Sequence, residues 1–246
     1  MPPASNTPHL NSFFSSAFKS LKAHGKPIAI TYTLLAVPVL ILILTGKDPG
    51  ILTAIQQPDN SSTHKIAEWV SEFGEFQYST LLVAALFGVI AWMRKGLARV
   101  RFREIAVGIL IAGLLGGVLV NVFRPTFGRA RPHQNEDGRF TWFRMNSRYQ
   151  GFPSGHTSST TASMTALAIL CPPAAAPAAA TSLAVGWSRM QRNKHYLSDV
   201  LGGLMLGSFC GLWTSLTMRE MRSRQQISNP PPEDPQPDSP TLDRKS

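Results

Sequence analysis

Long runs of apolar residues without a charged side chain constrain this chain more than any other feature. Residues 27–44 carry no charge. As a helix, at about 1.5 Å per residue, they would cover roughly 27 Å, close to the thickness of a hydrocarbon core. Residues 76–93, 105–123 and 200–218 form three further runs of this kind. Helices and closed barrels are the structures that satisfy backbone polar groups in a bilayer, and these runs predict spanning helices.

Two weaker apolar segments lie between the third and the last run. Residues 157–171 are rich in serine and threonine, and residues 174–187 are mostly alanine. Such segments insert poorly alone, so we expect stronger helices to shelter them; the alternative is a hairpin packed on one membrane face. Gly203, Gly207 and Gly211 repeat every four residues, a spacing that lets helices approach closely. We therefore predict an all-α, polytopic membrane protein with six transmembrane helices in a bundle.

Basic residues favour one orientation of this bundle. They gather before the first run, in residues 94–103 and after the last run. Because short basic loops stay in the cytoplasm, we expect cytoplasmic termini, with residues 124–156 and 188–199 on the outer face. The predicted units are a polar cytoplasmic N-terminal segment (1–26), a six-helix transmembrane domain (27–218) and a disordered, proline-rich cytoplasmic tail (219–246).

Charge and cysteine content argue against two other classes of protein. The net charge is +10, but the basic residues flank apolar runs or lie in short motifs, without a basic segment interleaved with aromatic residues. This pattern speaks against a nucleic-acid partner. Cys171 and Cys210 lie in or beside apolar runs without metal-ligand spacing, so we interpret them as packing residues.

A cluster of arginines is the first of three stretches that suggest chemistry. Arg124, Arg129 and Arg131 directly follow the third run. Three guanidinium groups next to a membrane are costly unless they meet anions. One interpretation is therefore a phosphate site. The alternative is that Arg124 only reaches lipid headgroups, while Arg129 supplies charge to the site.

The other two stretches add histidines. Residues 153–156 read Pro-Ser-Gly-His and lead into a predicted helix, whose free N–H groups suit a phosphate; the alternative is an ordinary helix start. The third stretch is Ser188-Arg189, five residues, His195, three residues and Asp199. Four residues apart at a helix start, the carboxylate of Asp199 can orient the imidazole of His195 and leave one nitrogen free to attack.

Together the three stretches resemble the signature motifs of the type 2 phosphatidic acid phosphatase superfamily. In the usual statement these are lysine, six residues and Arg-Pro; then Pro-Ser-Gly-His; then Ser-Arg, five residues, histidine, three residues and aspartate. The second and third motifs match at every specified position. The first matches at Arg131-Pro132 but has Arg124 in place of the usual lysine.

The resemblance implies a membrane phosphatase with its active site at the outer, periplasmic face. His195 would attack phosphorus to form a phosphohistidine, Asp199 would orient it, and His156 would protonate the leaving group. The implied phosphate ligands are Arg124, Arg131, Ser154, Gly155 and Arg189. Fixed arginines can neutralise a transferring phosphoryl group as metal ions do elsewhere, so we expect neither a metal ion nor a cofactor.

The sequence therefore predicts an integral protein of the bacterial inner membrane that hydrolyses a lipid phosphomonoester or pyrophosphate. Isoprenyl pyrophosphates, phosphatidate, phosphatidylglycerol phosphate and lipid A phosphate all remain open as substrates. Two alternatives are an enzyme like the vanadate-dependent haloperoxidases, which use a similar oxyanion pocket, and a catalytically inactive protein that binds lipid headgroups.

Overall fold

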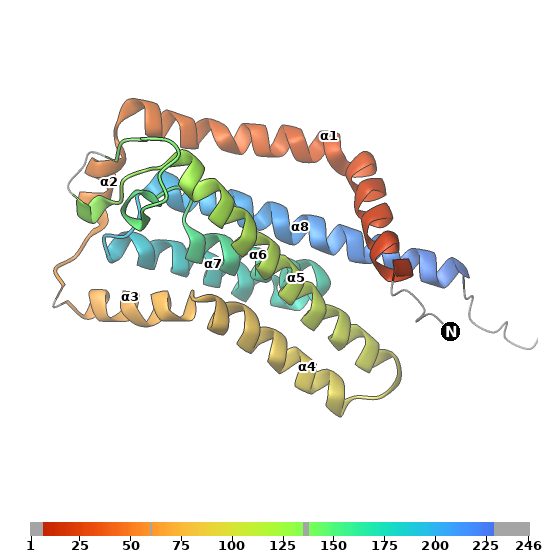
Figure 1. The fold of residues 1–246 in the computed structure, drawn as a ribbon. Helices are drawn as coiled ribbons and strands as arrows, with labels where there is room; N and C mark the ends of the chain where they lie inside the picture. The colour runs from red at the N-terminus through yellow and green to blue at the C-terminus, as the bar shows by residue number, and fades with distance from the viewer. Residues whose placement is uncertain (1–6, 60, 135–137, 229–246) are drawn as a thin grey trace, which may run out of the picture.

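The computed structural model describes residues 7–59, 61–134 and 138–228, and Figure 1 shows their arrangement. This part of the chain is all-α, as predicted, and its only strand-like pairing is an isolated bridge between Arg129 and Phe140. The α-helices are α1 (Thr7–Thr45), α2 (Asp48–Ile55), α3 (Ser62–Phe73), α4 (Val83–Met93), α5 (Gly96–Phe127), α6 (Gly155–Leu170), α7 (Ala175–Gln191) and α8 (Leu197–Ser228). Short helical segments lie at 77–82, 132–134, 147–149 and 172–174.

Helix α6 lies at the centre of the bundle and packs against α5, α7 and α8. Its small side chains allow this close packing, because glycines of the neighbouring helices lie directly against it. A methyl group added at Gly116 of α5 would contact Ala162, and one added at Gly207 or Gly211 of α8 would contact the α6 backbone. The glycines that repeat every four residues in the last helix therefore lie at a close helix–helix contact, as predicted.

The predicted helical membrane bundle is confirmed, but the predicted number of six spans is wrong. Among the described helices, three are long and apolar enough to cross a membrane: Lys22–Thr45 of α1, all of α5, and Leu197–Arg224 of α8. The pair Ser62–Phe73 and Gln77–Met93 reaches this limit only when counted together, with a bend of 63° between the two. Helices α6 and α7, with 16 and 17 residues, are short of the roughly 20 residues that a span requires.

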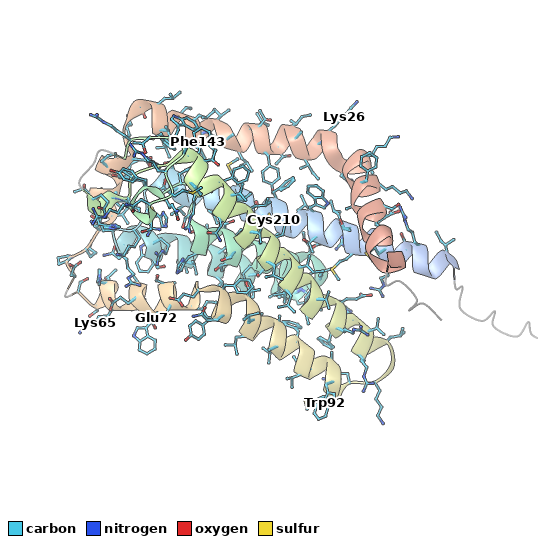
Figure 2. All side chains as sticks on the ribbon, viewed as in Figure 1. Lys26, Lys65, Glu72, Trp92, Phe143 and Cys210 are labelled. Atoms are coloured by element: carbon cyan, nitrogen blue, oxygen red, sulfur yellow. The ribbon has the colours of Figure 1, made fainter. Side chains whose placement is uncertain are left out.

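The outer surface of the bundle matches a lipid environment. Large apolar side chains of α1, α4 and α5 are exposed, among them Leu34, Leu86 and Val118. Such a continuous apolar surface is unusual for a soluble protein. In contrast, Cys210 is fully buried among alanines of α5 and α6 (Figure 2), as expected of a packing residue. Together with the spanning helices, this surface indicates an integral membrane protein.

Both terminal helices extend beyond the predicted transmembrane domain. Helix α1 begins at Thr7 and α8 continues to Ser228, so residues 219–228 are helical where we predicted disorder. Glu220 explains part of this extension, because it pairs with Lys19 of α1 at 2.9 Å and with Arg224 one turn later at 3.1 Å. The rest of the predicted tail, residues 229–246, lies outside the described residues.

Candidate active site

The three motifs meet at the end of the bundle where α5 ends and α6 and α8 begin (Figure 1). The backbone N–H of Ser154 donates to the carbonyl of Asp199 at 2.9 Å, which joins the second motif to the third. Arg124 joins the first motif to the second, because its Nε donates to the carbonyl of Pro153 at 3.1 Å. Residues separated by more than seventy positions in the chain therefore share one site.

His195 lies fully buried in the turn between α7 and α8. Its Nδ1 lies 2.8 Å from the carbonyl oxygen of Gly151. Since a carbonyl only accepts, Nδ1 carries the proton and Nε2 carries the lone pair. Nε2 is buried without a hydrogen-bond partner. The site thus holds an imidazole in the tautomer that a nucleophile requires, with its free nitrogen away from the backbone.

The surroundings of His195 also keep it uncharged. Burial lowers the pKa of His195 well below its usual 6.5, and the positive charges of Arg189, Arg124 and Arg131 lower it further; the bond to Gly151 opposes them. The neutral form prevails above this lowered pKa, so the imidazole is neutral at pH 7. A neutral imidazole is the form that can attack phosphorus.

The contact between Asp199 and His195 is longer than the hydrogen bond that their four-residue spacing suggested. Its Oδ2 lies 3.5 Å from His195 Nδ1, beyond a good hydrogen bond, and accepts instead from the backbone N–H of Tyr196 at 2.9 Å. The direct hydrogen bond of His195 Nδ1 is instead donated to the carbonyl oxygen of Gly151. Sequence reasoning missed Gly151, because a backbone carbonyl that orients a side chain has no residue-type signal.

Arg124 occupies the place expected of the first motif's cation. It lies in the last turn of α5, which Gly128 closes in the left-handed conformation, φ 57°. A side chain at Gly155 would contact the Arg124 guanidinium, so the glycine lets Arg124 lie against the first turn of α6. Ser154 is fully buried, and its Oγ accepts from Thr157 at 2.9 Å. Arg124 thus faces the N-terminal N–H groups of α6, where an anion is favoured.

Arg124, Arg131 and Arg189 form a group of positive charges near His195, here called the cationic wall. In the described part of the chain, four buried side-chain nitrogens have no hydrogen-bond partner, and three belong to Arg131, Arg189 and His195. Arg189 also donates from Nη1 to the buried hydroxyl of Ser71 in α3. The sequence offered no signal for Ser71, since one serine on an amphipathic helix is unremarkable. Unpartnered donors around a free histidine nitrogen are what a bound phosphoryl group would satisfy.

Arg129 does not belong to this wall. Its guanidinium forms ion pairs with Asp48 at 2.8 Å and Asp199 at 2.5 Å, and its Nε donates to the carbonyl of Gly138 at 3.0 Å. With its charge committed to two carboxylates, Arg129 has little left for a phosphate. The interpretation in which Arg129 supplies the charge in place of Arg124 is therefore not supported. Asp48, its partner, was not singled out from the sequence.

His156 stands at the entrance to the site. It is partly exposed and lines a cavity of about 430 Å³ together with Arg124 and Gly155. The rest of the lining is mixed: Glu75, Gln77 and Asn121 are polar, and Phe76, Leu114 and Val118 are apolar. The cavity can therefore receive an amphiphile, its charged end at Arg124 and His156 and its apolar part along Leu114 and Val118 of α5.

The described residues contain no cluster of three or more histidine, cysteine or carboxylate side chains arranged to hold a metal ion. Arginine is the cation that surrounds the histidines. Guanidinium groups near an imidazole can provide positive charge of the kind that phosphoryl transfer requires.

Two known proteins are similar to this chain in sequence. The chain is 34% identical over 106 residues to lipid A 1-phosphatase of Rhizobium johnstonii, a match that spans 42% of this chain and only 43% of that protein's length. It is 28% identical over 166 residues to lipid A 1-phosphatase of Rhizobium etli, spanning 63% of this chain and 72% of the relative.

The fold has a solved counterpart. The crystal structure of a transmembrane PAP2-type phosphatidylglycerolphosphate phosphatase from Bacillus subtilis aligns with a TM-score of 0.55, covering 82% of this chain and 95% of that one at 18% identity. At this identity the likeness concerns the fold alone. Residues 104–223, which contain all three motifs, match the family model of the PAP2 superfamily. This region, just under half of the chain, therefore matches the PAP2, or type 2 phosphatidic acid phosphatase, superfamily.

Proposed function

We propose that this protein is a lipid phosphate phosphatase that works through a phosphohistidine at His195. The observation that carries the proposal is the buried, unpartnered Nε2 of His195. Arg131 and Arg189, whose Nε atoms are also unpartnered, lie near enough for their charges to act on the imidazole. A phosphoryl group placed there would meet a nucleophile and the donors for its oxygens at once. Such preorganised charge is the largest contribution that most enzymes make to this chemistry.

The proposed reaction has two steps. The lone pair of His195 Nε2 forms a bond to phosphorus while the bond from phosphorus to the lipid oxygen breaks, and protonated His156 gives its proton to that oxygen. Burial and the positive charge of Arg189 lower the pKa of His156 to about 3; the negative charge of a bound phosphoryl group would oppose this shift and favour the protonated form. Water then attacks phosphorus and gives a proton to His156, while the bond from phosphorus to Nε2 breaks and returns its electron pair to His195. Phosphate then leaves. Arg124, Arg131, Arg189 and the first-turn N–H groups of α6 would balance the charge on the phosphoryl oxygens in both steps.

A lipid is the substrate class that fits the cavity beside His156. Its polar end is formed by Arg124, Gly155 and His156, and its walls include Leu114 and Val118 of α5, whose outer face is exposed. A hydrocarbon chain could therefore remain against the membrane while its phosphate reaches the histidines. Because two relatives are lipid A 1-phosphatases, we propose the phosphate of a lipid A-type glycolipid as the first substrate to test.

Phosphate release from a panel of lipids tests this proposal. Purified protein in detergent should release phosphate from one or more of lipid A, phosphatidate, phosphatidylglycerol phosphate and isoprenyl pyrophosphate, and should do so in excess chelator. Vanadate should inhibit, because it adopts the five-coordinate geometry of phosphoryl transfer and would bind the same donors. Activity that disappears in chelator and returns with magnesium would rule out the metal-free mechanism.

The same assay separates the two alternatives. Oxidation of bromide by hydrogen peroxide in the presence of vanadate, without phosphate release, would indicate a haloperoxidase-like enzyme. Binding of phosphorylated lipid without release of phosphate would indicate an inactive headgroup-binding protein.

We further propose that the site faces the periplasm from the inner membrane. The exposed Arg94, Lys95 and Arg99 lie at the α4–α5 turn, at the opposite end of the bundle from the three motifs (Figure 1). Since basic turns favour the cytoplasm, the motif end would face outward and both termini inward.

Cysteine labelling checks this orientation. In a variant without native cysteines, Lys65→Cys at the motif end should react with a membrane-impermeant maleimide in intact spheroplasts. Leu97→Cys at the α4–α5 turn, an 86% exposed position, should react only after the membrane is opened. Labelling of Leu97→Cys alone in intact spheroplasts would invert the orientation.

A further inference from the structure

A buried cluster of charges lies next to the candidate site, and among its members only Asp199 is a specified position of the three motifs. Asp48, Arg129, Ser198 and Asp199 are each at most 3% exposed. Arg129 donates from Nη2 to Asp48 at 2.8 Å and from Nη1 to Asp199 at 2.5 Å. Ser198 accepts from Arg129 at 2.5 Å and donates its hydroxyl to Asp48. One guanidinium therefore links two carboxylates, and one hydroxyl closes the network.

Asp48 is held in this network from a distant part of the chain. It is the first residue of α2, and it also accepts from the backbone N–H of Ser198 at 3.1 Å. Leu52, one turn later, packs against Met190, Tyr196 and Val200, on both sides of the turn that carries His195. Helix α2 thus packs against the turn that carries His195 through the apolar side chain of Leu52 and the carboxylate of Asp48. Asp48 lies outside residues 104–223, the family match.

Stability alone gives a weak reason for such a cluster. Two carboxylates and one guanidinium leave a net negative charge in the interior, and buried ion pairs often contribute no more than apolar residues of similar size. The guanidinium also stacks over the rings of Phe140 and Tyr196, at 5.0 and 4.6 Å, which fixes its plane. The cluster is therefore built to hold Arg129, and through it Asp199, in one position.

We propose that Asp48 and Arg129 are positioning residues for Asp199, and that Asp48 keeps the negative charge of Asp199 available to His195. The inference rests on the proposed phosphohistidine mechanism. If Arg129 paired with Asp199 alone, the two charges would cancel next to the imidazole. By sharing Arg129, Asp48 leaves the cluster with one net negative charge. Arg129 meanwhile fixes the carboxylate 3.5 Å from His195 Nδ1.

This charge matters during the attack on phosphorus. As Nε2 of His195 forms its bond, the imidazole acquires positive charge, which the nearby arginines oppose. A net negative cluster beside Nδ1 stabilises that developing charge more than it affects the neutral ground state. The phosphate ligands are not part of the cluster, so substrate binding should depend on it little.

The variant Asp48→Asn tests the proposal because it removes the charge and keeps the shape. We expect kcat to fall about ten- to hundredfold, the usual effect of removing an outer partner of an orienting group, with KM changed less than about twofold. Lipid phosphate hydrolysis by purified protein measures both constants. Wild-type protein in the same assay must release phosphate; if it does not, the proposed function fails before this inference is tested.

A matched control and a milder variant cover loss of folding. Glu104→Gln changes a carboxylate paired with Arg222 at 3.3 Å near the other end of the bundle, and should leave kcat and thermal unfolding near wild type. Ser198→Ala removes only the hydroxyl between Asp48 and Arg129, and should lower kcat about three- to tenfold at unchanged KM. Folded Asp48→Asn and Ser198→Ala proteins with wild-type kcat, or a rise in KM alone, would overturn the proposal.

A double variant distinguishes positioning from general destabilisation. If Asp48 acts through Asp199, then Asp48→Asn should slow phosphoenzyme formation little, by less than about twofold, once Asp199→Asn is present. Single-turnover formation of phosphohistidine measures this in both backgrounds. The same factor in both backgrounds would show that Asp48 acts independently of Asp199, and the inference would be wrong.

Discussion

His195→Ala should form no phosphoenzyme and should lose turnover by about 10⁴-fold or more, as expected when a nucleophile is removed. In this protein the nitrogen that would attack is Nε2 of a buried imidazole whose other nitrogen donates to Gly151. The guanidinium groups around it are positively charged and cannot attack phosphorus, and His156, the second imidazole of the site, is assigned to proton transfer. Alanine leaves the cationic wall in place but removes the atom to which phosphorus would be transferred.

Trapping of the intermediate measures this effect. Substrate carrying labelled phosphate should transfer label to wild-type protein, and the label should survive alkali but not acid, as a phosphohistidine does. His24→Ala, on the exposed surface of α1, is the matched control and should keep both label and turnover. Near-normal turnover in His195→Ala, or label on another residue, would mean that the nucleophile is assigned incorrectly.

His156→Ala should reduce turnover of a lipid phosphate by roughly 10² to 10⁴-fold, the range typical of a missing general acid. His156 lines the cavity beside Arg124 and Gly155, where the leaving oxygen of a bound lipid phosphate would lie. An alkoxide or sugar oxygen leaves poorly without a proton. A phenolate leaves well without one, so the same variant should lose much less activity on p-nitrophenyl phosphate in a single turnover.

The contrast between the two leaving groups identifies the role of His156. Proton donation by His156 is supported if His156→Ala turns over the lipid much more slowly than wild type but releases p-nitrophenol at nearly the wild-type rate in a single turnover. Equal losses on both substrates would place His156 in phosphate binding instead, since binding of the phosphoryl group does not depend on the leaving group. Control measurements with His24→Ala should show no change with either substrate.

The motifs and the spanning helices were readable from the sequence because both depend on local pattern. Spacing alone predicts that His195 and Asp199 share a helix start, and uncharged length alone predicts α1, α5 and α8. The number of spans was overestimated for the same reason. Segments 157–171 and 174–187 are apolar enough to suggest helices, but their helices, α6 and α7, are shorter than a span and α6 is surrounded by other helices.

The sequence by itself determined the all-α membrane class, the three motifs and the residues around which a phosphoryl site is built, since these follow from composition and from spacing along one helix. Only the tertiary structure decided which groups hold those residues. The Gly151 carbonyl holds Nδ1 of His195, Ser71 holds Arg189, and Asp48 with Asp199 engages Arg129. These contacts join positions far apart in the chain, and some use backbone atoms that every residue carries. Their specificity therefore arises from packing, which brings the groups into hydrogen-bond distance only when the bundle is complete.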